Sequence, residues 1–253
     1  MKKSVERAMP VIFGIIGLCL WQGAIWITQT PAYVLPGPIA IVTAYFDDYG
    51  TLNAALLSTL TVTFAALLAA TVLGVVLALV MAASDLARAA VQPWAVTLQV
   101  TPIVAIAPLI IIWVNQPFLA LVVCATIVAF FPVLSNTAAG LAATPHDLLD
   151  LFRLNGATRL QTLLLLRLPA ALPYFLAGLR IAGTLALVGA VVAEFVAGSG
   201  GFASGLAYRI LEAGYRLEIP RMFAALVLLG FAGIAIYTAL GLFSHLMLRR
   251  RDA

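Results

Sequence analysis

The stretch NGATRLQTLLLLRLPAALP, residues 155–173, is unusual because it carries two arginines and two prolines inside a very apolar chain. A glycine is its second residue, and long apolar runs lie on both sides of it. Glycine commonly ends a helix, and proline within a helical pattern bends or ends one. The stretch therefore predicts a short charged helix with marked ends between two long hydrophobic helices.

The composition around this stretch is that of a membrane protein. Of the 253 residues, 64% are apolar and 9% are charged, and the mean hydropathy is +1.11. A soluble domain has about 25% charged residues, so this chain cannot cover a globule with polar surface. The net charge of +4 does not indicate nucleic-acid binding, because the basic residues lie at the ends of apolar segments and form no single patch.

Six segments are long and apolar enough to cross a bilayer, which takes about 20 residues. The first is expected to be retained, since no small-x-small cleavage site follows it. We therefore predict an all-α integral membrane protein that forms one transmembrane domain over residues 1–253. The six predicted spans are 10–28, 56–83, 94–114, 118–137, 172–197 and 222–247.

The basic residues indicate the orientation. With the N-terminus inside, eleven lie on the inner side and three, Arg209, Arg216 and Arg221, on the outer side. Inner loops of membrane proteins carry the excess of Lys and Arg, so both termini are predicted to be cytoplasmic. The inner residues are Lys2, Lys3, Arg7, Arg88, Arg153, Arg159, Arg167, Arg180, Arg249, Arg250 and Arg251.

The longest inner segment lies between the fourth and fifth spans. Thr144 is expected to cap a helix that starts at Pro145, and Leu148, Leu151 and Phe152 then share one apolar face. Such a face suits docking into the groove of a cytoplasmic partner. The alternative is an interfacial helix resting on lipid headgroups.

The same segment has a predicted corner. Asn155-Gly156 signals the end of the first helix, and a second helix is expected from Thr158 to Leu168. Pro169 and Pro173 are then predicted to break or kink that helix.

This segment resembles the motif of ABC-importer permeases, which runs Glu-Ala-Ala, three residues, Gly, nine residues, Ile, any residue, Leu-Pro. Gly156 and Leu168-Pro169 match it, while Asp150 stands for the glutamate and Leu166 for the isoleucine. Leu151 and Phe152 replace the two alanines. The similarity is closest to the nitrate, taurine and sulfonate branch, which includes importers of pyrimidine precursors. Further stretches resemble that branch: VLPGP at 34–38, TPIVAIAPLIIIW at 101–113, LPAALPYFLAGLRIA at 168–182 and VVAEFVAG at 191–198.

The resemblance implies a type I ABC importer permease in the bacterial inner membrane. It implies a homodimer, two ATP-binding subunits that carry ATP and Mg²⁺, and an extracytoplasmic solute-binding protein. No cofactor is expected on this chain. The resemblance makes residues 144–169 the coupling segment, with contacts to the ATPase from Asp147, Asp150, Leu151, Phe152, Arg153, Asn155, Gly156, Arg159 and Pro169.

The chain lacks the residues that an ATPase or a metal enzyme needs. Lys2 and Lys3 are its only lysines, so it has no phosphate-binding G-x-x-x-x-G-K-[ST] loop. His146 and His245 are far apart, and no metal site is expected. The glycine-rich stretch 198–205 follows a membrane helix and is expected to be an outer turn, a gate or a contact for the binding protein.

Polar residues and prolines inside the spans are candidates for the translocation pathway, because polar groups in a bilayer usually face the protein interior or water. Each also has a structural alternative: an interhelical hydrogen bond, a packing kink, or for Glu194 a bond to helix ends or to Arg209. The pathway or gate candidates are Gln99, Thr101, Pro102, Pro108, Asn136 and Glu194.

The outer segment carries Arg209, Glu212, Arg216 and Glu218 near helical spacing. They are expected to form either a solvated helix or a contact for the binding protein. The leading hypothesis is thus the permease subunit of an importer of a small organic solute or anion. A self-contained secondary carrier or channel is the alternative; such proteins commonly contain internal repeats and an intramembrane ion site, and neither is found here.

Overall fold

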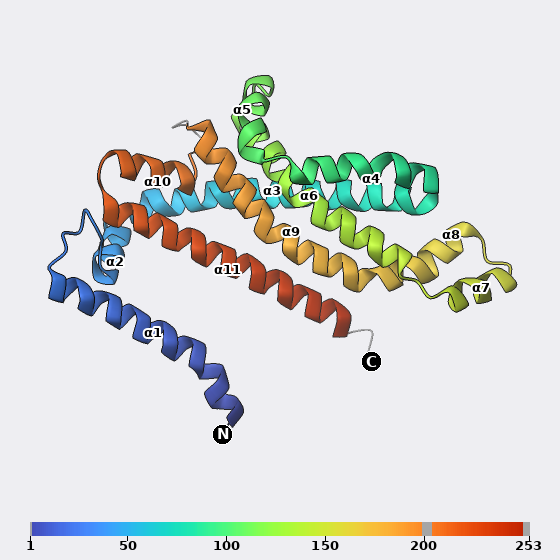
Figure 1. The fold of residues 1–253 in the computed structure, drawn as a ribbon, viewed down its shortest axis with the longest axis horizontal. Coiled ribbons are helices and arrows are strands. Elements are labelled where there is room, and N and C mark those ends of the chain that lie inside the picture. Colours follow the sequence, from blue (N-terminus) through green and yellow to red (C-terminus); the bar gives the residue numbers. More distant parts are fainter. Residues whose placement is uncertain (1, 199–203, 250–253) are drawn as a thin grey trace.

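A computed structural model describes residues 2–198 and 204–249, with side chains described from residue 9 onward, and every regular element in these ranges is helical (Figure 1). The predicted all-α class is therefore confirmed. The basic side chains of Lys2, Lys3 and Arg7, the residues Arg250 and Arg251, and residues 199–203 of the predicted outer turn lie outside the described part.

Five helical segments are long and apolar enough to cross a membrane, and a bent pair makes up to six. The elements are α1 (Lys2–Thr28), α2 (Pro38–Asp47), α3 (Tyr49–Ala83), α4 (Asp85–Val100), α5 (Ile103–Trp113), α6 (Pro117–Ala142), α7 (His146–Leu154), α8 (Arg159–Thr162), a π-helical turn (Leu163–Arg167), α9 (Leu168–Ala197), α10 (Leu206–Tyr215) and α11 (Ile219–Arg249).

The third predicted span, 94–114, is not one straight helix. α4 and α5 meet at an angle of 102°, and Thr101 between them is extended, with φ −75° and ψ 120°. Proline disfavours helical backbone in the residue before it and cannot donate a backbone hydrogen bond. Pro102 therefore explains the bend, and α5 leaves the bundle in a new direction (Figure 1).

The segment between the first two predicted spans, residues 29–55, contains a helix of its own, because residues 38–47 form α2. Pro38 lies in the first turn of α2. A backbone N–H at this position would have no acceptor within the helix, so proline, which lacks the N–H, loses no hydrogen bond there. Ile41 is buried with Leu52 of α3, Leu206 of α10 and Ala224 of α11. This apolar cluster fastens α2 and α10 to the long helices at one end of the bundle.

The centre of the bundle is the crossing of α6 and α9, where glycines allow close approach. A methyl group added to Gly178 would lie 2.6 Å from the carbonyl oxygen of Pro132, and one added to Gly189 would lie 2.8 Å from Cα of Ala125. Membrane helices associate closely where such small residues line the contact. α9 is therefore held tightly against α6.

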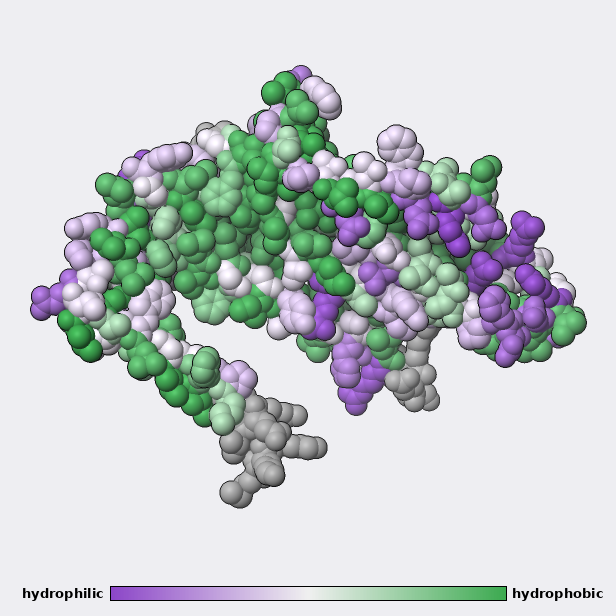
Figure 2. All heavy atoms as spheres, viewed as in Figure 1, coloured by the Kyte–Doolittle hydropathy of each residue, from purple (hydrophilic) through white to green (hydrophobic). Residues whose placement is uncertain are grey.

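The two ends of the bundle differ in polarity. Hydrophilic residues gather at the end where α7 and α8 lie, and hydrophobic residues cover most of the visible bundle (Figure 2). The start of α1 and the end of α11 both point toward the α7 end (Figure 1), as expected for an even number of crossings. That this end faces the cytoplasm stays a prediction from the charge distribution.

Candidate functional site

The α7 helix projects from the hydrophilic end of the bundle. It starts at His146, one residue later than predicted, and Pro145 occupies the position before it. The predicted cap is wrong, because the Thr144 hydroxyl is buried and donates to the carbonyl of Leu141 at 3.4 Å. Asp147 lies in the first turn, where a negative charge stabilises the helix dipole.

The exposed apolar side of α7 is made of leucines. Leu148, Leu151 and Leu154 are 42%, 52% and 86% exposed. Phe152, predicted on this side, is half-buried instead, as is Leu149. Asp150 and Arg153 form an ion pair of 3.3 Å on the surface, and such exposed pairs stabilise little. The three leucines are therefore the surface that a partner can cover.

A Schellman motif ends α7 at the predicted position. Gly156 has φ +74°, its N–H donates to Arg153 O at 3.0 Å, and the Ala157 N–H donates to Phe152 O at 3.0 Å. The Asn155 side chain donates to Leu151 O at 2.8 Å. This pair of backbone bonds around a left-handed residue is the usual way a helix is closed.

The chain after the corner forms one continuous helical rod. Thr158 and Gln161 form a capping box at the start of α8, and the π-helical turn leads directly into α9. Pro169 and Pro173 do not break the helix, although it changes direction between α8 and α9 (Figure 1). Pro169 has no N–H to donate, and the wider π turn, closed by the Leu168 N–H to Leu163 O, lets the helix continue past it.

A groove of about 740 Å³ lies between the end of α3 and the segment from α7 to the π-helical turn. Arg153, Arg159 and Arg167 contribute its positive charge, and Leu79 and Leu149 contribute apolar wall. Of the predicted coupling residues, only Arg153 and Arg159 line this groove. The other predicted coupling residues lie on α7, at its corner, or in the first turn of α9.

At the opposite end of the bundle, Glu194 of α9 is buried, with 3% of its surface exposed. Its Oε2 accepts the Thr59 hydroxyl at 3.2 Å and the Ala207 N–H at 3.1 Å. The Leu206 N–H donates to Thr59 Oγ1 at 2.9 Å. Glu194 therefore binds the start of α10, one of its predicted alternatives, and Arg209 is not its partner among these bonds. Sequence reasoning missed Thr59, because no local pattern links it to Glu194.

The charged residues of the outer segment form ion pairs with one another and with Asp48. Glu212 binds Arg209 at 2.7 Å and Arg216 at 2.8 Å. The hydrogen bond from Arg209 is the main cause that lowers the pKa of Glu212 below its ordinary value. Arg209 and Glu212 lie on α10, and Arg216 is the residue that follows its end at Tyr215. Glu218 lies beyond this helix and binds Arg221, which also binds Asp48 at 2.6 Å.

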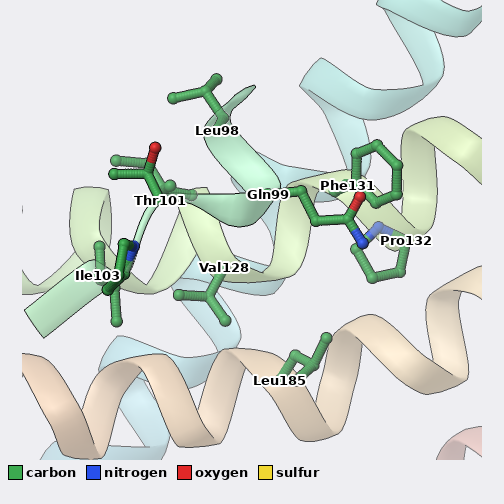
Figure 3. A pocket seen from close by; sticks show the side chains of 10 residues that line it. Leu98, Gln99, Thr101, Ile103, Val128, Phe131, Pro132 and Leu185 are labelled. Atoms are coloured by element: carbon green, nitrogen blue, oxygen red, sulfur yellow. The ribbon is translucent and has the colours of Figure 1, made fainter. Parts of the chain in front are cut away.

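A hollow of about 330 Å³ lies at the bend between α4 and α5, against α6 and α9 (Figure 3). It brings together three of the six pathway candidates, Gln99, Thr101 and Pro102, with Phe131 and Leu185 among the apolar residues. The Gln99 amide points toward Phe131 and Pro132 (Figure 3).

The other three pathway candidates do not line this hollow. Asn136 donates to Pro132 O at 2.9 Å, so its hydrogen bond lies within α6 and is not the interhelical bond expected as its structural alternative. Pro108 is exposed on α5, and Glu194 of α9 accepts a hydrogen bond from Ala207 in the first turn of α10.

A bundle of membrane helices with a bent pair, a mostly apolar hollow at that bend and a projecting helix at its charged end fits the class of transport permeases. Residues 70–252 match the family described as the inner membrane component of binding-protein-dependent transport systems. The chain belongs to this family, and it is a multi-pass permease component of an ABC importer of the inner membrane.

Relatives of full length support this assignment. A probable ABC transporter permease of Haemophilus influenzae is 34% identical, covering 96% of this chain and 97% of the relative. The formylaminopyrimidine transport permease of Halalkalibacterium halodurans is 32% identical, covering 98% of each. The riboflavin transport system permease of Chloroflexus aurantiacus is 31% identical, covering 95% and 89%. A crystal structure of an amino acid ABC transporter shares the fold, with a TM-score of 0.65 at 20% identity, covering 79% of this chain and 96% of that chain.

Proposed function

We propose that the segment 144–169 docks a separate ATP-binding subunit, and that ATP hydrolysis on that subunit drives solute import. The observation that carries this proposal is α7, whose exposed leucines project from the charged end of the bundle. A short amphipathic helix of this kind fits a groove in a partner. The corner at Gly156 connects α7 to the helical segment that continues into α9. A displacement of α7 by the ATP-binding subunit would therefore be transmitted to a membrane-spanning helix.

We further propose that two copies of the permease pair and that a solute-binding protein contacts the opposite end. α5 leaves the bundle with Ile112 69% and Trp113 74% exposed, which offers an apolar surface to a second copy. The ion pairs of Arg209, Glu212 and Arg216 lie at the end remote from α7 and offer charged groups to a binding protein.

Leu151→Asp is expected to abolish co-purification of the ATP-binding subunit with the permease, because it places a charge in the apolar surface that the partner would cover. Leu86→Asp is the matched control: Leu86 is 81% exposed in the first turn of α4, outside the segment. The measurement is the amount of ATP-binding subunit retained on the tagged permease, at equal recovery of folded permease.

Equal retention by wild type and Leu151→Asp would contradict docking through α7. Absence of any ATP-binding subunit, with solute uptake driven by an ion gradient instead, would favour the secondary carrier.

For the solute, we propose a planar nitrogen heterocycle. Two relatives above 30% identity are named for a solute, formylaminopyrimidine and riboflavin, whereas those named for sulfonates and bicarbonate are 27% and 26% identical. The hollow at the α4–α5 bend offers Phe131 as an apolar ring and Gln99 as an amide donor and acceptor. This combination suits a flat ring with polar edges better than a small anion.

Gln99→Leu is expected to reduce uptake of a labelled aminopyrimidine by vesicles containing the transporter about tenfold, the effect of losing about 1.4 kcal/mol of binding. Gln92→Leu, on the same helix but outside the hollow, is expected to leave uptake unchanged. Uptake of labelled ethanesulfonate in place of the aminopyrimidine would overturn the solute class.

A further inference from the structure

We propose that Glu194 is a positioning residue that latches α10 to α3 and α9, so that contact of a binding protein with α10 is transmitted along α9 to the coupling segment. The proposal rests on the function proposed above. We call the group formed by Thr59, Glu194, Gly205, Leu206 and Ala207 the latch.

The latch joins three helices through one closed set of hydrogen bonds. Thr59 belongs to α3, Glu194 to α9, and Leu206 and Ala207 are the first residues of α10. The first N–H groups of a helix have no helical acceptor, and here Thr59 and Glu194 accept two of them. A carboxylate at a helix start is also favoured by the helix dipole. The bonds therefore fix where α10 starts.

Gly205 makes the fit between the carboxylate and the chain close. A Cβ added to Gly205 would collide with the carboxylate of Glu194, and that part of Glu194 cannot retreat because the residue is buried. Only glycine admits the carboxylate so near to the backbone at this position. The contact therefore allows little sliding between α9 and α10.

The rest of α10 is held by apolar packing rather than by polar bonds to α9. Leu206, Ile210 and Ala213 are buried, and the first two pack in the cluster with α2 and α11. Loss of the latch should therefore leave α10 folded on α11 while freeing it from α9. This difference separates a role in transmission from a role in folding.

The latch and the coupling segment lie at the two ends of one rod. Residues Arg159–Ala197 form a continuous helical segment of 39 residues, which is about 58 Å at 1.5 Å per residue. One end of the rod follows the Gly156 corner and the other carries Glu194. α9, which makes up most of this segment, packs closely on α6 at Gly178 and Gly189.

The test is the ATPase activity of the complex assembled from the permease, its ATP-binding subunits and the solute-loaded binding protein of the same host. Thr59→Val removes the hydroxyl while keeping the shape of the side chain, and Thr59→Ser keeps the hydroxyl. Thr63→Val is the matched control, because Thr63 is equally buried one turn away but bonds only its own helix, at Thr59 O. Glu194→Leu provides a second variant, which removes both carboxylate oxygens and hence the acceptor for the Thr59 hydroxyl and the Ala207 N–H.

We expect Thr59→Val and Glu194→Leu to keep the basal ATPase activity but to lower its stimulation by the binding protein about tenfold, within the usual range of coupling between sites. Thr59→Ser and Thr63→Val should retain the stimulation. Full stimulation in both latch variants would overturn the proposal, as would an equal loss in Thr63→Val. A wild-type complex without ATPase activity even in the presence of the solute-loaded binding protein would instead overturn the proposed function, so the two failures are distinguishable.

Discussion

Gly178→Ala is expected to lower the unfolding temperature of the purified permease by several degrees. The added methyl group would lie 2.6 Å from Pro132 O and 2.7 Å from Cβ of Asn136. Neither neighbour can move freely, since one is backbone and the other is the first atom of a side chain. Overpacking of this kind costs roughly 1–3 kcal/mol, and each kcal/mol shifts the unfolding temperature of a chain of this size by about 2–4 °C.

Gly230→Ala is the control for helix propensity. Gly230 lies inside α11 with nothing within 4 Å of an added Cβ, and alanine is favoured over glycine in a helix by about 1 kcal/mol. We expect this variant to unfold at the wild-type temperature or slightly above it. The buried thiol of Cys124 can report unfolding through a thiol-reactive dye, with Cys19 replaced by alanine. If Gly178→Ala has the same unfolding temperature as Gly230→Ala, α6 and α9 do not approach each other as closely as the structure places them.

The features that the sequence predicted best are those set by local chemistry. The long apolar runs identified the spanning helices because a bilayer requires about 20 apolar residues. The Asn155-Gly156 pair identified the end of α7 because glycine takes the left-handed conformation at little cost. The asymmetric distribution of arginines identified the hydrophilic end of the bundle.

The features that were missed are of two kinds. In some segments hydropathy and proline predict different structures, and in others the contact joins residues far apart in the sequence. Hydropathy over 94–114 gives one span, although Pro102 divides it into two helices at 102°. Pro169 indicates a break in the helix because it cannot donate a backbone hydrogen bond, but the helix continues through the π turn that precedes it. Thr59 and Glu194 are 135 residues apart, so neither sequence neighbourhood indicates the other. The candidate site was therefore predictable at its corner and not at its latch.

Gly156→Val is expected to stop ATP-driven uptake, whereas Gly156→Asn should retain most of it. The left-handed conformation costs an L-residue about 1–2 kcal/mol, and a β-branched residue is a rare outlier there. Asparagine adopts the conformation far more readily, and it also occurs at this helix-ending position. The two variants therefore differ mainly in how well they tolerate φ +74°.

The surroundings of Gly156 make the comparison clean, because nothing lies within 4 Å of an added Cβ. A loss of function in Gly156→Val would then come from the backbone and not from a clash. If the corner opens, α7 turns away from the rod, and the exposed leucines no longer face the groove of the ATP-binding subunit. A cost of about 1.4 kcal/mol at docking lowers the affinity for that subunit tenfold, and we expect at least this effect. The measurements are ATP-dependent uptake in vesicles and the affinity of the permease for the ATP-binding subunit. Equal uptake by the valine and asparagine variants would show that the corner does not orient α7 for docking, and the transmission path would then have to enter the membrane elsewhere than through α9.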